Sequence, residues 1–198
     1  MRISSIRKGS GCVVELKAKP PLGGLDRSWG QTRLRELTEL AIVAVSVPQG
    51  AEADVGKAMK ASYGCSVLSP GQSHLSDDGV RVVSYSADQM LICWNGQLHS
   101  GVQAVHEKLG DVGYYVEQTS NFVALELDGP IARDALVRLT AINLKDAAFP
   151  VDAAQRTVME HLGAMVIRTG QDSFWLLSAT SSARSFGHAI ETSLDWVS

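Results

Sequence analysis

The sequence contains no long hydrophobic run and no signal for a membrane anchor. Its longest apolar run, residues 41–47, is far shorter than the roughly 20 residues that a membrane-spanning helix needs. The basic residues near the start, Arg2, Arg7 and Lys8, are not followed by the apolar stretch of a secretory signal. We therefore expect a cytoplasmic protein with no membrane contact.

Basic blocks and closely spaced cysteines are also missing. The 198 residues carry a formal net charge of −3, and no aromatic residues are interleaved with Lys or Arg, so nucleic-acid binding is not expected. The three cysteines, Cys12, Cys65 and Cys93, form no CxxC pair. In a cytoplasmic protein such a scattered set indicates reduced, mostly buried thiols.

The motifs of common catalytic and cofactor sites are missing too. There is no GxGxxG, no GxxxxGK followed by Ser or Thr, and no GxSxG. The histidines form no HxH, HExxH or Cys/His cluster; they are His74, His99, His106, His161 and His188. The pair Asp77 and Asp78 precedes Gly79, which favours a turn over a carboxylate dyad. We predict no catalytic residue, no metal site and no cofactor in this chain.

The first part of the chain, residues 1–30, is predicted to be an extended arm with at most one edge strand, over residues 10–19. Glycines and the pair Pro20-Pro21 interrupt it, so it has little to bury by itself. Trp29 is the aromatic residue here least easily assigned to a local core. Since buried aromatics often dominate interfaces, Trp29, Pro20 and Pro21 are our candidates for a partner interface.

Alternating and helical hydrophobic patterns follow the arm and indicate an α+β protein with 45% hydrophobic residues. The predicted strands cover residues 41–47, 80–85, 90–94, 121–127, 157–159, 164–168 and 174–177. The predicted helices cover residues 51–63, 98–109, 131–139 and 181–196, and residues 69–79 are predicted to form a loop.

An internal repeat divides the body into two units, residues 31–116 and 117–198. The run 82–83 matches 166–167 at an offset of 84 residues, and the strand at 42–45 matches 122–125 at an offset of 80. Each unit reads strand, helix, strands, helix. Two such units, with helices on one face of each sheet, would bury a shared core in one compact body. The alternative is that α+β chains share such patterns without a duplication.

The second unit contains a pattern that resembles a known family. In residues 118–136 a strand, Gly129-Pro130 and a helix follow one another, and residues 143–157 contain Phe149-Pro150, small residues, and Gln155-Arg156 before Thr157. These stretches resemble the gamma subunit of heterotetrameric sarcosine oxidase and, more generally, aminomethyltransferase-like proteins. Residues 172–176 and 182–186 resemble its closing strand and helix.

Two features depart from the family pattern. Residues 86–92 lack the Pro and Trp that the family usually has in its first unit. Residues 160–167 lack the Asp that catalytic relatives place after a Gly-Gly pair; Glu160 comes before the turn. The resemblance thus implies the aminomethyltransferase folate-binding fold without a carboxylate to act as a base.

The resemblance implies a structural, non-catalytic subunit of a complex with alpha, beta and delta subunits. In the family the partner subunits carry FAD, FMN and NAD and oxidise sarcosine to glycine, with the methyl carbon passed to tetrahydrofolate or released as formaldehyde. Another N-methylated amine is an open alternative to sarcosine. The second hypothesis is a stand-alone folate-binding or aminomethyl-transferring protein, since fold analogy alone does not fix function.

Overall fold

Two antiparallel sheets, each covered by two helices, make up the part of the chain that the computed structural model describes, residues 19–96 and 100–198. The predicted edge strand at 10–19 lies almost entirely outside these residues, and Cys12 lies outside them. The observed architecture is α+β, as the sequence predicts. None of the described helices is both long and apolar enough to cross a membrane.

The first sheet has five strands in the order β4-β5-β6-β3-β7. They are β3 (Leu40–Ser46), β4 (Ser73–Leu75), β5 (Arg81–Ser86), β6 (Gln89–Asn95) and β7 (Tyr114–Glu117). The helices α1 (Glu52–Tyr63) and α2 (Gly101–Leu109) cover one face. Helix α1 ends at Gly64, which adopts a left-handed φ of 76° and donates its N–H to Lys60 O.

The second sheet has six strands in the order β1-β2-β8-β11-β10-β9. They are β1 (Asp26–Trp29), β2 (Thr32–Glu36), β8 (Phe122–Asp128), β9 (Ala154–Met159), β10 (Leu162–Arg168) and β11 (Ser173–Ala179). Helices α3 (Ala132–Val137) and α4 (Ala183–Val197) cover its outer face. Three short 3-10 turns are η1 (Gly110–Val112), η2 (Thr119–Asn121) and η3 (Thr180–Ser182).

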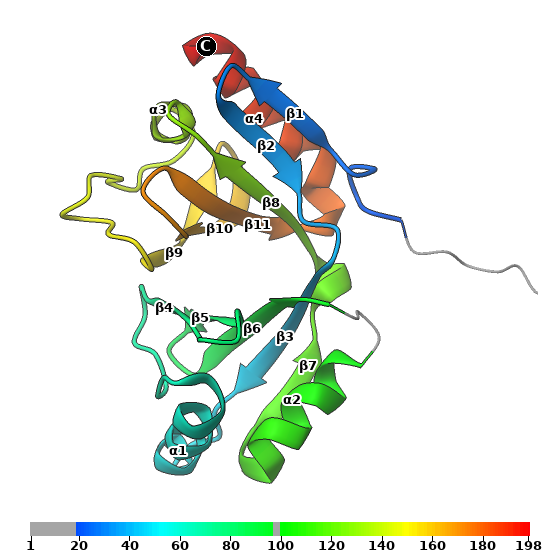
Figure 1. Ribbon diagram of the computed structural model, residues 1–198, viewed down its shortest axis with the longest axis vertical. Helices are drawn as coiled ribbons and strands as arrows, with labels where there is room; N and C mark the ends of the chain where they lie inside the picture. The colour runs from blue at the N-terminus through cyan, green and yellow to red at the C-terminus, as the bar shows by residue number, and fades with distance from the viewer. Residues whose placement is uncertain (1–18, 97–99) are drawn as a thin grey trace, which may run out of the picture.

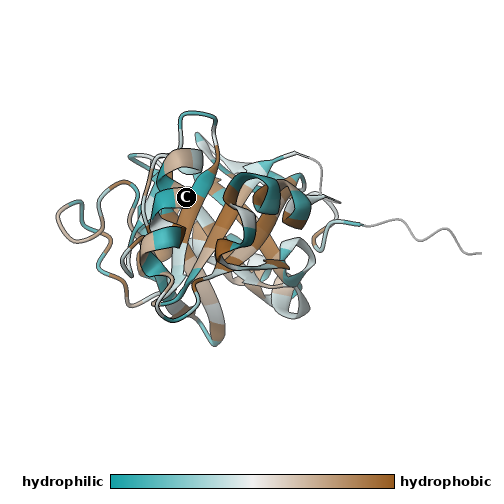
Figure 2. Cartoon of the chain, turned by 90° about the horizontal axis from the view of Figure 1, so that it is seen from below, coloured by the Kyte–Doolittle hydropathy of each residue, from teal (hydrophilic) through white to brown (hydrophobic). Residues whose placement is uncertain are grey.

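The sheets pack face to face, which gives four layers in the order helices, sheet, sheet, helices (Figure 1). Side chains alternate along each strand, so Val43 and Val45 of β3 face α1 and α2. Ile42 and Ala44 of the same strand face the second sheet in the shared core. Figure 2 shows apolar residues concentrated in the strands between the helix layers. The strands thus have apolar residues on both faces, as buried layers require.

The strand register agrees with one of the two offsets on which the internal repeat was predicted. Val82 pairs with Ile92 in the first unit and Val166 pairs with Leu176 in the second, which reproduces the offset of 84 residues. The predicted offset of 80 for the first strand is wrong, because Val43 pairs with Ile92 whereas Leu125 pairs with Leu176. The register therefore gives an offset of 82. A shift of two residues keeps every side chain on the same face, so the hydrophobic pattern could not detect it.

The N-terminal hairpin of β1 and β2 belongs to the second sheet, which changes the predicted division of the chain. Residues 26–29, predicted as part of an extended arm, form β1, and β2 pairs with β8 of the second unit. Leu34 lies opposite Leu127 and is fully buried on the helix side. This pairing joins segments far apart in the sequence, which no local pattern can reveal.

Two further strands were not predicted. Strand β4 has three residues, lies within the predicted loop 69–79 and pairs with β5. Strand β7 has four residues and pairs with β3. The turn predicted at residues 77–79 is confirmed: Gly79 has a φ of 82° and donates its N–H to Ser76 O at 3.0 Å.

Candidate functional site

The candidate interface prolines lie at a pocket of about 350 Å³ where the two units meet. The pocket is lined by the start of the described chain, by the connection between β2 and β3, and by the linker that includes η2. Most of its surface is apolar, with Pro20, Pro21, Leu40, Ile42 and Phe122 among the lining residues. Such a hollow suits an apolar side chain better than a charged ligand.

Glu36 positions the prolines beside this pocket. Its carboxylate is buried and accepts hydrogen bonds from the N–H groups of Leu22, Gly24 and Leu25 at 2.9, 2.7 and 3.3 Å. One acid at the end of β2 thus fixes the turn that follows Pro20. Glu36 was not identified from the sequence. Thr32, Leu34 and Glu36 are the alternate, buried residues of β2, and an acid at a buried position of a strand needs hydrogen-bond donors, which was the available signal.

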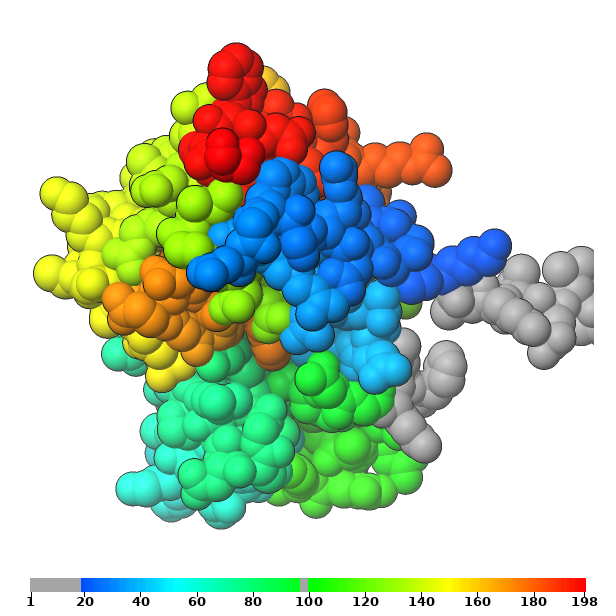
Figure 3. All heavy atoms as spheres, turned by 45° about the horizontal axis from the view of Figure 1, so that its top comes forward, coloured from blue at the N-terminus to red at the C-terminus, as the bar shows by residue number. Residues whose placement is uncertain are grey.

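Trp29 lies elsewhere, at the far end of the β1–β2 hairpin. Its indole Nε1 donates to Asp195 of α4 at 2.6 Å, and the ring packs on the helix-side core of the second unit. Arg27 forms an ion pair with Glu191 of the same helix at 2.7 Å. Figure 3 shows the hairpin, in blue, lying against α4, in red. Trp29 therefore has a local core, contrary to expectation, and its role in a partner interface stays a prediction.

A second polar site joins the two units at the sheet edges. Arg81 of β5 is buried and forms an ion pair with Asp152 at 2.7 Å. Ser73 of β4 donates its N–H to Asp152 O at 2.6 Å, and its hydroxyl accepts from Arg81 at 3.0 Å. The Arg81 guanidinium also faces the ring of Trp175, 5.7 Å from the ring centroid. We call Arg81, Ser73 and Asp152 the clasp.

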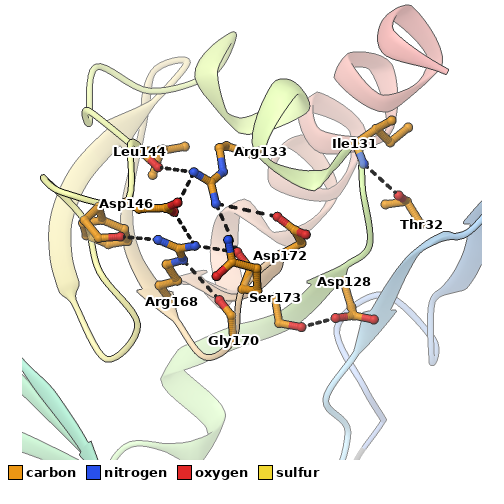
Figure 4. Close-up of polar contacts among 12 residues, drawn as sticks. Thr32, Asp128, Ile131, Arg133, Leu144, Asp146, Arg168, Gly170, Asp172 and Ser173 are labelled. Carbon is orange, nitrogen blue, oxygen red and sulfur yellow. Dashed lines mark hydrogen bonds and ion pairs between the residues drawn. The ribbon is translucent and has the colours of Figure 1, made fainter.

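A third polar cluster fixes the segment between α3 and β9 (Figure 4). Asp146 accepts from Arg168 at 2.7 Å and from Arg133 at 2.9 Å, and these hydrogen bonds lower the pKa of its carboxyl group. Arg168 is buried and also donates to the carbonyls of Phe149, Gly170 and Gln171. Because its donors are occupied by the protein itself, this cluster has a structural role.

The described histidines and cysteines form no reactive arrangement. His161 and His188 line a groove of about 600 Å³ beside Trp196, and within residues 19–96 and 100–198 no three His, Cys, Asp or Glu side chains are placed to hold a metal. Burial raises the pKa of the Cys93 thiol to about 12 and also raises the pKa of Cys65. Both thiols are therefore protonated at neutral pH and are poor nucleophiles.

Comparison with known proteins gives structural matches only. No family model and no curated protein matches the chain. A chain of heterotetrameric sarcosine oxidase from Corynebacterium sp. U-96 superposes with a TM-score of 0.74 and 20% identity, over 87% of this chain and 88% of that one. Aminomethyltransferase T of the glycine cleavage system from Bartonella henselae superposes with a TM-score of 0.61 and 14% identity.

The chain has the fold of these two proteins. The match to aminomethyltransferase T covers 87% of this chain but 56% of that protein, so the chain spans about half of the transferase. The predicted similarity to the aminomethyltransferase fold is confirmed. At these identities the likeness concerns the fold alone, and function has to be argued separately.

Proposed function

We propose that this chain is a non-catalytic structural subunit of a sarcosine oxidase complex, equivalent to the gamma subunit. The observation that carries the proposal is the extent of the match. The chain and the sarcosine oxidase chain correspond over nearly their whole lengths, 87% and 88%, whereas the transferase has much additional structure. Because this chain has the same fold as the sarcosine oxidase chain and nearly the same length, it could occupy the equivalent position in a complex.

The chemistry of the described residues is consistent with this role. Buried Arg81 contacts the carboxylate of Asp152 and the hydroxyl of Ser73, and buried Arg168 contacts Asp146 and three backbone carbonyls. The thiols of Cys65 and Cys93 are buried. These groups stabilise the fold rather than face a substrate. In the proposed complex the alpha, beta and delta subunits are the partners and supply FAD, FMN, NAD and the tetrahydrofolate site, in the cytoplasm.

Co-expression of the chain with alpha, beta and delta subunits tests the proposal. We expect size-exclusion chromatography to show equimolar co-elution with the flavin absorbance. Omitting the chain should lower the thermal stability of the remaining complex more than its rate of sarcosine oxidation per flavin. Elution of the chain as a free monomer, apart from intact flavoprotein subunits, would contradict the proposal. Replacing sarcosine with other N-methylated amines identifies the substrate of the complex.

A second candidate is a stand-alone folate-binding or aminomethyl-transferring protein. The superposition on aminomethyltransferase T over 87% of the chain favours it. Tryptophan fluorescence during a titration with tetrahydrofolate separates the two candidates, because Trp94, Trp175 and Trp196 are all at least partly exposed reporters. A saturable change would favour binding by this chain alone, and a flat titration would reject it.

A further inference from the structure

The two sheets have corresponding strands, but the second sheet has one strand more at one edge. Strand β2 lies beside β8 as β7 lies beside β3, and both pairings are antiparallel. In the second sheet, β1 then covers the outer edge of β2. In the first sheet the order ends at β7, and no described strand pairs with its outer edge. The first sheet thus lacks the counterpart of β1.

Two exposed side chains at this open edge are apolar. Tyr114 and Val116 lie on the same face of β7 and are 69% and 49% exposed. The register makes them equivalent to Arg33 and Arg35 of β2, since they lie opposite Ser46 and Ala44 as the arginines lie opposite Asp128 and Glu126. Arg33 has a partner in Asp26 of β1. Apolar side chains on an open strand edge are unusual, because they invite pairing with another chain.

The backbone of β7 is also available for pairing. Gln118 donates its N–H to Ile42 O of β3 at 2.9 Å. Because N–H groups alternate in direction along a strand, those of Tyr114 and Val116 also point to β3. The N–H and C=O groups of Tyr115 and Glu117 then point to the open edge. An added strand would find both hydrogen-bonding groups and apolar side chains there.

We infer that the outer edge of β7 binds an extended, antiparallel segment of a partner subunit, an inference that rests on the proposed function. Carboxylates flank the apolar pair. Asp111, before β7, contacts His106 at 2.8 Å and keeps a side chain that is 98% exposed. Glu117, at the end of β7, accepts the N–H of Thr119 on Oε1 at 3.0 Å, which leaves Oε2 for a second contact. The segment is therefore expected to carry apolar residues at alternate positions and a Lys or Arg beside them. A second copy of this chain fits poorly, because its β7 would bring Asp111 and Glu117 of both copies to one seam.

Site-specific cross-linking in the co-expressed complex tests this inference. With p-benzoylphenylalanine in place of Val116, irradiation and mass spectrometry should identify a partner-subunit peptide with alternating apolar residues and a basic residue. The same probe in place of Val137, an exposed residue of α3, should not label that peptide. A cross-link from position 116 to residues 1–18 of the same chain, or to a second copy, would overturn the inference.

Substitutions measure the contribution of the edge to assembly. V116D should lower partner co-elution at least tenfold, whereas V137D, at a similarly exposed valine, should leave it unchanged. Thermal unfolding of both isolated variants should match that of the wild type. If the wild-type chain joins the complex and V116D co-elutes equally well, the strand addition is overturned but the proposed function is not. A wild-type chain that never joins the complex would contradict the proposed function as well.

Discussion

Arg81 of the first unit and Asp152 of the second form an ion pair with 2.7 Å between Nη1 and Oδ1. The ion pair links the two sheets near their edge strands, β4 in the first sheet and β9 in the second. Gln72 and Ala153, which precede these strands, also form a β-bridge. Asp152 adopts a left-handed φ of 68°, a conformation that Asp tolerates better than most residues. Asp152 follows the Phe149-Pro150 pair closely, so the segment between α3 and β9 ends in the contact between the two units.

We predict that Asp152→Ala lowers the free energy of unfolding by about 1–3 kcal/mol, because it removes the partner of buried Arg81 and leaves Ala in a left-handed conformation. Solvent screening keeps the loss below that of a fully buried pair, since the Asp152 side chain is 47% exposed. Asp152→Asn should cost less. Urea unfolding gives the values, with exposed Asp54→Ala as control. Equal losses for Asp152→Ala and Asp54→Ala would contradict a role for the clasp.

Gly129 is predicted to tolerate no side chain. It has a φ of 129°, and a Cβ there would lie 2.5 Å from Thr32 Cα and 2.6 Å from Gln31 O, both backbone atoms of the neighbouring hairpin. Gly129→Ala should therefore cost more than about 3 kcal/mol or prevent folding. Gly163→Ala is the matched control, because no atom lies within 4 Å of its added Cβ. Soluble yield and thermal unfolding measure both; equal stability of the two variants would refute the steric argument.

Local patterns predicted the elements whose partners are close in sequence. The strands β5, β6, β10 and β11 were predicted, and so was the offset of 84 residues that relates β5 to β10. Each pair is joined by a short turn, which fixes its register. The helices α1 and α4 followed from their spacing of apolar residues. These features sufficed for the fold class and for the repeat.

The remainder depends on contacts between distant segments. Strand β2 is defined by its pairing with β8, and β7, with four residues, by its pairing with β3. For the candidate site, Pro20 and Trp29 are close in sequence, yet one lines the pocket between the units and the other contacts α4. Residues that are close in sequence therefore do not share a surface here, because strand β1 extends away from the pocket and places Trp29 at its far end.

Removal of the Glu36 carboxylate is predicted to loosen the start of the described chain. Glu36→Ala leaves three backbone N–H groups without their acceptor, which costs about 1–3 kcal/mol where these groups stay buried. Limited proteolysis should then cleave near residues 19–25 faster, and hydrogen exchange of the Gly24 amide should accelerate. Glu39→Ala, at an exposed residue in the following turn, is the control. Unchanged cleavage in Glu36→Ala would show that the turn holds without the carboxylate.

Asp146 is predicted to contribute to the pH dependence of stability. Hydrogen bonds from Arg168 and then Arg133 lower its pKa in the folded state, whereas an unfolded Asp titrates near about 3.9. The folded state thus binds the proton more weakly, so this contribution is present above the unfolded pKa and is lost as the pH falls through the folded pKa. Urea midpoints of the wild type should therefore fall more steeply below about pH 5 than those of Asp146→Asn. The difference between the two proteins should be largest near pH 7 and should shrink toward pH 2, whereas exposed Asp134→Asn should track the wild type throughout. Parallel curves for the wild type and Asp146→Asn would show that the contacts of Arg168 with backbone carbonyls, and not its carboxylate partner, hold this segment.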